Sequence, residues 1–276
     1  MQDGFNIPEM CAALDGTAFA SIPVADKLHY FASIGSTNAC ALQQAQAGAP
    51  EWSVYFADEQ TDGRGRGGHS WHSEAGAGLY VSVLLRPRLS PADALFLSLA
   101  TGIAVRAAIF SVTGFEVDIR WPNDLLLGKK KCGGILVETA ASANGNESPE
   151  LRHAVIGVGL NVNHAELPRD IATLATSLRM ESGHAWQRQD LLLALLLALH
   201  DEVERLQTDI TEHGTPVKML ERFSTASTWV RGKRVHVEEA GGYTGVTDGL
   251  NARGFLRVRT ADGMRTVLSG GVRELH

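Results

Sequence analysis

The 276-residue chain has few cysteines and no excess of positive charge. Cys11, Cys40 and Cys132 are odd in number, lie far apart and form no C-x-x-C pair, which argues against a disulfide framework and a cysteine-based zinc site. With 25 basic and 31 acidic residues, the formal charge is -6, which argues against nucleic-acid or membrane affinity driven by bulk charge. We therefore expect a protein of the reducing cytoplasm.

The sequence also lacks an export signal and a long hydrophobic run. Residues 1–10 have no basic n-region and no apolar h-region. The longest aliphatic run, Leu191 to Leu199, is far shorter than the ~20 residues that span a bilayer. We expect neither export nor a membrane span, while the hydrophobic content of 44% is enough for a substantial core.

Residues up to about 225 mix predicted strands with predicted helices. Runs of β-branched, aromatic and aliphatic residues between turn formers predict strands over 52–57, 79–85, 116–120, 134–138 and 154–161. Capping residues and apolar periodicity predict helices over 90–112, 191–206 and 216–223. The polar stretch 142–150 is expected to be an exposed connection.

The pattern changes after Thr225. Short strands separated by glycine turns are expected over 234–238, 243–247, 255–259 and 265–268. About fifty residues are enough for a small β-barrel. The sequence thus predicts an α+β fold, with a mixed central sheet and packed helices over residues 1–225 and a small barrel over residues 226–276.

Residues 60–71 read Gln-Thr-Asp-Gly-Arg-Gly-Arg-Gly-Gly-His-Ser-Trp, and we call them the Gly-Arg loop. Glycine lets backbone N–H groups approach a ligand, and guanidinium groups suit carboxylate or phosphate. The loop formally contains G-x-G-x-x-G, but a strand follows where a dinucleotide-binding turn requires a helix. No Gly-Lys-Ser/Thr of a P-loop follows either. An RGG-like nucleic-acid segment and a solvated surface loop remain as alternatives to an anion site.

Three further segments accompany this loop: Ser36-Thr37-Asn38, residues 120–138 with Arg-Trp-Pro-Asn-Asp and Lys-Cys-Gly-Gly-Ile-Leu-Val-Glu, and Gly-Val-Gly-Leu-Asn-Val-Asn at 157–163. In this order and spacing the motifs resemble biotin protein ligases. The resemblance implies a biotin/lipoate ligase-like catalytic domain over 1–225 and an SH3-like domain over 226–276. It also implies an ATP-dependent enzyme that converts biotin to biotinyl-5′-AMP. Biotin would then pass to a lysine of a biotin carboxyl carrier protein, a subunit of acetyl-CoA carboxylase or a similar protein.

The resemblance assigns roles to individual residues. The implied biotin-binding residues are Ser36, Thr37, Asn38, Gln60, Gly63, Arg64, Trp71, Gly134, Leu136 and Gly157. The implied nucleotide-binding residues are Arg66, Arg120, Asn123, Asp124, Lys131 and Asn161. Catalytic roles fall to Lys131, Arg66 and Arg64: Lys131 would bridge the biotin carboxylate and the α-phosphate, and Arg66 would retain the adenylate. Ser36 and Thr37 also precede a helical pattern, so a helix cap is an alternative that can coexist with binding.

Mg²⁺ is the metal implied for ATP chemistry, with Asp124 as its candidate ligand. An Asx turn after Pro122 is the structural alternative for Asn123 and Asp124. His69 stands where the family loop often has an arginine. His69 and His72 have a suggestive spacing, but without a carboxylate or thiol partner we assign them no metal.

Partners follow from the same resemblance. Only 35 residues precede Ser36 and they show no helix-turn-helix pattern, so we predict a monofunctional ligase that does not bind DNA. The resemblance is compatible with a homodimer. The nearer alternative function is a lipoate or octanoate ligase or transferase, which the Gly-Arg-Gly-Arg sequence disfavours. The farther alternative is a non-enzymatic module that binds an anion or nucleic acid.

Overall fold

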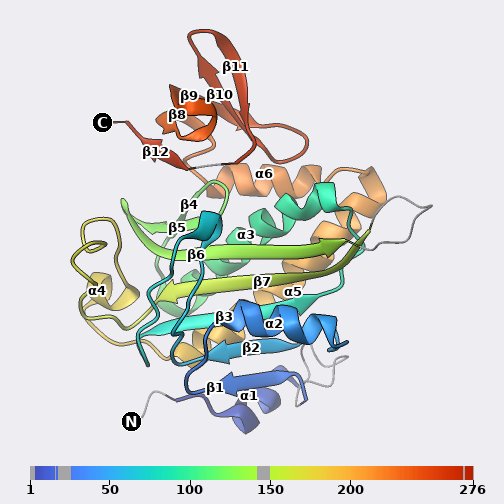
Figure 1. Ribbon diagram of the computed structural model, residues 1–276, viewed down its shortest axis with the longest axis vertical. Coiled ribbons are helices and arrows are strands. Elements are labelled where there is room, and N and C mark those ends of the chain that lie inside the picture. Colours follow the sequence, from blue (N-terminus) through green and yellow to red (C-terminus); the bar gives the residue numbers. More distant parts are fainter. Residues whose placement is uncertain (1–3, 16, 18–25, 142–149, 270, 276) are drawn as a thin grey trace.

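A seven-stranded mixed sheet forms the centre of the molecule (Figure 1). The structure is a computed structural model, and it describes residues 4–15, 17, 26–141, 150–269 and 271–275. The sheet has the order β1-β2-β3-β7-β6-β5-β4, in which β1 and β2 are parallel and the other neighbours are antiparallel. Its strands are β1 (Leu28–Phe31), β2 (Val54–Ala57), β3 (Gly78–Leu85), β4 (Asp118–Arg120), β5 (Asp124–Leu127), β6 (Lys130–Ala141) and β7 (Leu151–Asn161).

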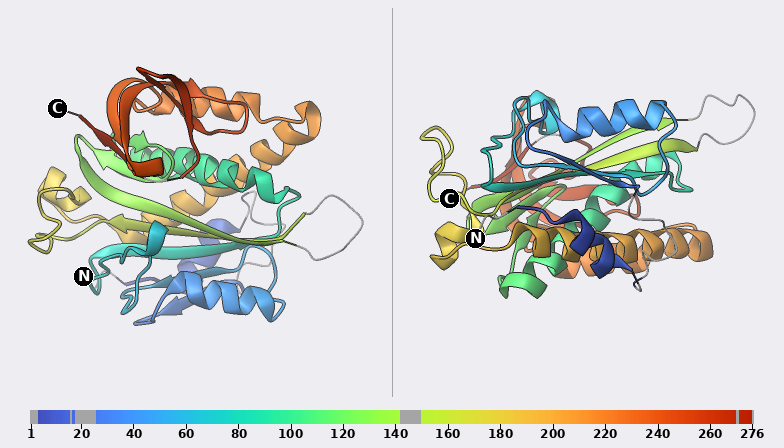
Figure 2. Two further views of the ribbon diagram at one scale, coloured as in Figure 1. Left: turned by 45° about the horizontal axis from the view of Figure 1, so that its top comes forward. Right: turned by 90° about the horizontal axis from the view of Figure 1, so that it is seen from below.

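Helices cover both faces of this sheet (Figure 2). α2 (Thr37–Gln46) lies on one face, against β2, β3 and β7. The other face carries a layer of longer helices. This layer consists of α1 (Ile7–Leu14), α3 (Ala94–Thr113), α5 (Arg188–His213) and α6 (Val217–Ala226).

Side-chain alternation along the strands divides the core between the two faces. Successive residues of a strand point to opposite sides. Ile156 and Val158 of β7 therefore join the large cluster under α3 and α5, whereas Val155 packs with Tyr55 and Leu84 against α2. The α2 face is thus the thinner side of the molecule, and it is the side that leaves room for a ligand.

The helix α3 is the central element of the larger layer. Ser90 and Asp93 form a capping box around the 3-10 turn η3 (Pro91–Asp93), and Gly114 ends the helix in a left-handed conformation with φ 72°. Among the described residues, Pro91–Thr113 is the one helical segment long and apolar enough to cross a membrane, but 61% of its most apolar window is buried. Its packing against α5 and the sheet is that of a core helix. The helix predicted over 90–112 is confirmed.

A five-stranded antiparallel sheet follows α6, with the order β11-β10-β9-β8-β12. It packs on the α6 end of the molecule (Figure 1). Trp121 reaches it, because the indole Nε1 donates a hydrogen bond of 2.9 Å to the carbonyl of Gly254. Trp121 is only 2% exposed and belongs to the core. The strands are β8 (Arg231–Val237), β9 (Tyr243–Leu250), β10 (Leu256–Thr260), β11 (Gly263–Val267) and β12 (Val272–Glu274), with the turn η4 (Glu239–Gly241) after β8.

Several short elements were not predicted. They are α1, β1, β5, β12, the short helix α4 (Leu178–Ser182) and the turn η2 (Arg66–Gly68) inside the Gly-Arg loop. Except for α1, each has five residues or fewer, which is too short to display a period. The connection predicted over 142–150 lies, apart from Glu150, outside the described residues.

Candidate active site

A pocket opens on the α2 face of the sheet, next to the Gly-Arg loop. It contains about 460 Å³ of space, part of it open to solvent. The loop, the start of α2 and the strands β3, β6 and β7 supply its walls. The lining residues are Ser36, Thr37, Asn38, Gln60, Arg64, Gly65, Arg66, Trp71, Val81, Ser82, Asn123, Lys131, Gly134, Ile135, Leu136, Gly157, Val158 and Gly159.

The floor of the pocket is formed where glycines replace side chains on neighbouring strands. Gly157 of β7 pairs with Ser82 of β3 and with Leu136 of β6. Gly159 pairs with Gly134 in the next row. A Cβ at Gly157 would lie 2.3 Å from Asn38 Oδ1, and one at Gly159 would lie 2.6 Å from the Trp71 ring. Glycine is therefore required at both positions by the close approach of other side chains.

One end of the pocket is a continuous polar network. The Gln60 Oε1 accepts hydrogen bonds from Thr37 N at 2.9 Å and Thr37 Oγ1 at 3.0 Å. The Ser82 hydroxyl lies 2.8 Å from Thr37 Oγ1 and 2.7 Å from Asn38 Oδ1. Asn38 Nδ2 donates to Glu138 Oε2 at 2.8 Å. These contacts fix the orientation of each amide and hydroxyl before any ligand binds.

Ser36 both caps α2 and lines the pocket. Its hydroxyl accepts a hydrogen bond from Ala39 N at 3.4 Å, so the helix-cap alternative is confirmed. Ser82 and Glu138 belong to the network but were missed from sequence. Ser82 lies inside an apolar strand, and Glu138 is the last residue of the strand predicted over 134–138. Neither stands out from its neighbours until the strand register brings them to Asn38.

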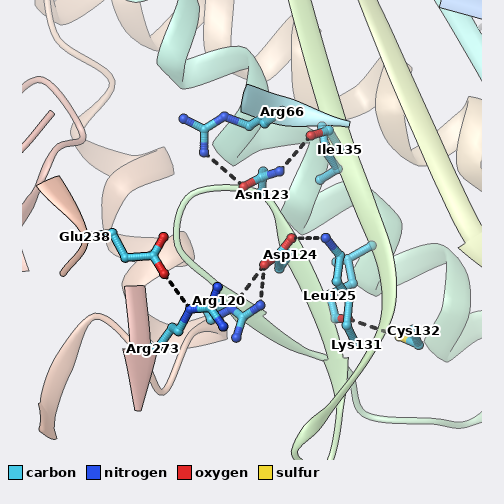
Figure 3. Close-up of polar contacts among 10 residues, drawn as sticks. All are labelled: Arg66, Arg120, Asn123, Asp124, Leu125, Lys131, Cys132, Ile135, Glu238 and Arg273. Atoms are coloured by element: carbon cyan, nitrogen blue, oxygen red, sulfur yellow. Dashed lines mark hydrogen bonds and ion pairs between the residues drawn. The ribbon is translucent and has the colours of Figure 1, made fainter. Parts of the chain in front are cut away.

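The other end of the pocket is cationic (Figure 3). Lys131 Nζ lies 2.5 Å from Asp124 Oδ1, and 5.3 Å above the centre of the Trp71 ring. Arg120 Nη2 lies 2.6 Å from the other carboxylate oxygen of Asp124. Burial alone would raise the pKa of Asp124, but Lys131 and Arg120 outweigh it and hold that pKa below its usual value. Asp124 therefore stays charged and holds the Lys131 ammonium at the pocket.

The Gly-Arg loop meets the same region through Arg66. Arg66 Nη1 donates to Asn123 Oδ1 at 3.1 Å, and Asn123 Nδ2 donates to the carbonyl of Ile135 at 2.9 Å. Figure 3 shows Arg66 and Asn123 directed at one another beside the Asp124 cluster. Arg64 makes an exposed ion pair with Asp62 at 3.1 Å, which contributes little and is easily exchanged for a ligand.

Four of the predicted residues, Gly63, Arg120, Asp124 and Asn161, stay outside the pocket lining. Gly63 lies behind the wall, where an added Cβ would be 2.5 Å from the carbonyl of Trp71. Arg120 packs over Trp229 at 5.4 Å and pairs with Asp124. The Asn161 amide donates to the Thr176 carbonyl at 3.0 Å. The side chains of Arg120, Asp124 and Asn161 therefore contact other groups of the protein and do not face the pocket.

Replacing Asp124 by asparagine should lower the free energy of unfolding at pH 7. The substitution leaves the charges of Lys131 and Arg120 unneutralised, and hydrogen bonds to charged groups are worth about 1.5–3 kcal/mol. Since the folded-state pKa is below the usual 3.8, the contribution of Asp124 is present above about pH 4 and is lost as the pH falls further.

Urea unfolding of the protein and of Asp124→Asn at several pH values measures this difference. The gap should be constant from pH 7 to about pH 4 and shrink below it. Asp262→Asn is the matched control, since Asp262 is 83% exposed and 4.0 Å from Arg265. Equal stability of Asp124→Asn and the unmodified protein at pH 7 would show that the ion pairs of Asp124 with Lys131 and Arg120 do not stabilise the fold.

Comparison with known proteins agrees with the fold and the pocket. The sequence profile of the Biotin/lipoate A/B protein ligase family matches residues 30–161, which include every residue of the pocket lining. The bifunctional ligase/repressor BirA of Bacillus spizizenii is 34% identical over 244 residues, covering 87% of this chain and 71% of that protein. The biotin--[acetyl-CoA-carboxylase] ligase of Mycobacterium tuberculosis is 33% identical, covering 89% of this chain and 87% of that protein.

A solved structure has the same overall fold. The biotin protein ligase from Aquifex aeolicus in complex with biotin and ATP superposes with a TM-score of 0.75 at 27% identity, covering 90% of this chain and 99% of that chain. Fold and pocket therefore define a ligase of the biotin and lipoate type. Within that class, the chain belongs to the biotin protein ligase family.

Proposed function

We propose that this chain joins biotin to ATP to give biotinyl-5′-AMP and pyrophosphate, and then transfers biotin to a lysine of a biotin carboxyl carrier protein. The observation that carries the proposal is one pocket with two chemically different ends. A prearranged amide and hydroxyl network lies at one end, and Lys131, Arg66 and Asn123 lie at the other. The family, shown by its relatives, supports the same reaction.

The polar end suits the ureido group of biotin. Biotin combines an uncharged ureido ring with an apolar thioether ring and a valerate arm, so it needs few fixed polar partners within apolar walls. Ser36, Thr37 and Gln60 are proposed to contact the ureido group. Asn38 is linked to Thr37 through the Ser82 hydroxyl. Trp71 and Leu136 would flank the rings and the arm above the glycine floor.

The cationic end suits the activation step. A carboxylate oxygen of biotin attacks the α-phosphorus of ATP, the new oxygen–phosphorus bond forms, and pyrophosphate leaves with the bonding electrons. Two anions must approach for this to occur, so nearby positive charge lowers the barrier. Lys131 is proposed to contact both the carboxylate and the α-phosphate, with Arg64 and Arg66 adding charge from the loop. In the second step the carrier amine attacks the acyl carbon, and AMP leaves as the amide forms.

Mg²⁺ is proposed to enter with the nucleotide. Both carboxylate oxygens of Asp124 are engaged, one by Lys131 and one by Arg120, which does not fit direct coordination of a metal. Mg²⁺ is often held by substrate phosphate oxygens and water. We therefore assign Asp124 the task of positioning Lys131 and no metal contact.

Biotin-dependent exchange of labelled pyrophosphate into ATP tests the proposed reaction. We expect exchange with biotin and none with lipoate or octanoate, because the polar network is placed for the ureido group that these acids lack. Exchange with lipoate or octanoate alone would assign the chain to the related ligases. Absence of exchange with every acid, from folded protein, would favour a binding module.

Replacing Arg66 by alanine should let the intermediate escape. Arg66 connects the Gly-Arg loop to Asn123 across the pocket, so its loss frees the loop from the segment that would face the adenylate. We expect biotinyl-5′-AMP in the filtrate after ultrafiltration to rise at least tenfold, with pyrophosphate exchange reduced less. Arg88→Ala is a control on an exposed arginine outside the lining. Full retention of the adenylate by Arg66→Ala would contradict the role.

Further parts of the proposal concern domains and partners. We propose that residues 1–225 are the catalytic domain and that residues 226–276 form an SH3-like domain, supported by the five-stranded antiparallel sheet. We propose that this chain acts as a ligase alone and does not bind DNA. A specific mobility shift of operator DNA would contradict this. The cytoplasm is the proposed location, and analytical ultracentrifugation tests whether two copies of the chain form a homodimer.

A further inference from the structure

Three side chains that the proposed reaction does not use meet just outside the pocket. They are His72 and Glu74, which directly follow the Gly-Arg loop, and His164, which follows β7. Their ligand atoms all lie within 4.8 Å of one another. Trp71 lines the pocket, whereas the neighbouring His72 does not.

His164 is the unusual member of this group. Its exposure is 1%, yet neither ring nitrogen has a hydrogen-bond partner among the described residues. Buried polar atoms in folded proteins are almost always paired, so this ring is available to a partner that the described residues do not supply.

We propose that His72, Glu74 and His164 form a binding site for a transition-metal ion of the Zn²⁺ class. His72 was assigned no metal from sequence for want of a carboxylate partner, and the fold supplies that partner in Glu74. Two imidazoles and one carboxylate are a donor set that Zn²⁺ accepts, with the fourth position left for water. The same set is poorly suited to Mg²⁺, which prefers oxygen ligands in an octahedron. The site is therefore separate from any Mg²⁺ that accompanies ATP.

The donor atoms of the three side chains need to move only slightly to bind one ion. Tetrahedral Zn²⁺ with bonds of about 2.0–2.1 Å sets neighbouring donor atoms about 3.3 Å apart. His72 Nε2 already lies 3.9 Å from Glu74 Oε2, and the His72 and His164 ring centres are 5.8 Å apart. His72 and Glu74 are exposed and can rotate toward an ion, whereas His164 is fixed by its burial.

The backbone around the ligands is well anchored. The Tyr80 hydroxyl donates to the Glu74 carbonyl at 3.1 Å, and the Ser177 hydroxyl donates to the His164 carbonyl at 2.6 Å. The amide of Asn163 donates to the Ala77 carbonyl at 2.6 Å, which joins the two segments. A bound ion would add a second link between the end of the Gly-Arg loop and the end of β7. Ligands on prearranged backbone lose less freedom on binding.

Titration of the full chain with Zn²⁺ and with Co²⁺ tests the proposal. We expect one ion per chain, with Co²⁺ giving the visible absorption of a four-coordinate site. His72→Gln and Glu74→Gln should each raise the dissociation constant for Zn²⁺ at least tenfold and remove the visible absorption of bound Co²⁺. Both residues are exposed, so the substitutions should not disturb folding. His69→Gln is the matched control, because this exposed histidine of the same loop lies outside the cluster.

Three results would overturn the site. They are the absence of Zn²⁺ binding by the unmodified protein, equal affinity in His72→Gln and Glu74→Gln, and binding of Mg²⁺ as tight as that of Zn²⁺. The readout is metal binding, so the outcome does not depend on whether biotin ligation is measured in the same sample.

Discussion

Alanine at position 131 is expected to reduce biotin-dependent pyrophosphate exchange by about 100- to 1,000-fold, the usual effect of removing one preorganised charge-stabilising group. Lys131 is the ammonium that Asp124 holds 2.5 Å away at the pocket, above the Trp71 ring. Its loss removes positive charge from the place where the biotin carboxylate and the α-phosphate must meet. Because the effect is on the transition state, kcat should fall more than the KM for biotin rises.

The neighbouring lysine provides the control for this experiment. Lys129 lies in the exposed turn between β5 and β6, two residues from Lys131, so Lys129→Ala changes the same charge without touching the pocket. Its exchange rate should stay within about twofold of the unmodified protein, since distant exposed charges are screened by salt. Lys131→Ala with near-normal exchange would remove Lys131 from the mechanism.

A single methyl group on the pocket floor should also have a large effect. In Gly157→Ala the new Cβ would lie 2.3 Å from Asn38 Oδ1, so Asn38 must move away from Ser82 and Glu138. We expect the KM for biotin to rise at least tenfold while the KM for ATP changes little. Overpacking of this kind costs about 1–3 kcal/mol, so the melting temperature should fall as well.

Gly35→Ala separates the clash from the general effect of replacing glycine. Gly35 has no atom within 4 Å of an added Cβ, and its backbone lies outside the left-handed region. This variant should keep both KM values and its melting temperature. If Gly157→Ala and Gly35→Ala behave alike, the close approach to Asn38 has no consequence for biotin.

The long elements could be predicted because their signals are local. The helix α3 has a cap, a proline and a terminal glycine, and the strands β3 and β7 have apolar runs between turn formers. The strand β5 could not be found in this way, since Asp124–Leu127 is short and begins inside a motif. Its existence depends on pairing with β6, and pairing depends on residues far apart in the chain.

The candidate site was predictable as a set of motifs but not as a geometry. Every predicted biotin-binding residue except Gly63 lines the pocket, while Asp124 and Asn161 direct their side chains at other protein groups. Sequence shows that a carboxylate is near a lysine, but not that two cations occupy both of its oxygens. The cluster around His164 was missed for a similar reason, because 92 positions separate it from His72.

The contact between Trp121 and Gly254 limits how freely parts of this protein could be exchanged with those of a relative. Gly254 has φ 78°, and a Cβ there would lie 2.9 Å from Leu99 of α3. Its carbonyl accepts the Trp121 indole, two residues before Asn123 and three before Asp124. A chimaera that imported a foreign C-terminal sheet without this turn would disturb the segment holding Lys131. Because this turn lies between β9 and β10, an exchange that protects catalysis must either keep the whole C-terminal sheet with its own catalytic domain or import a sheet that has the same turn.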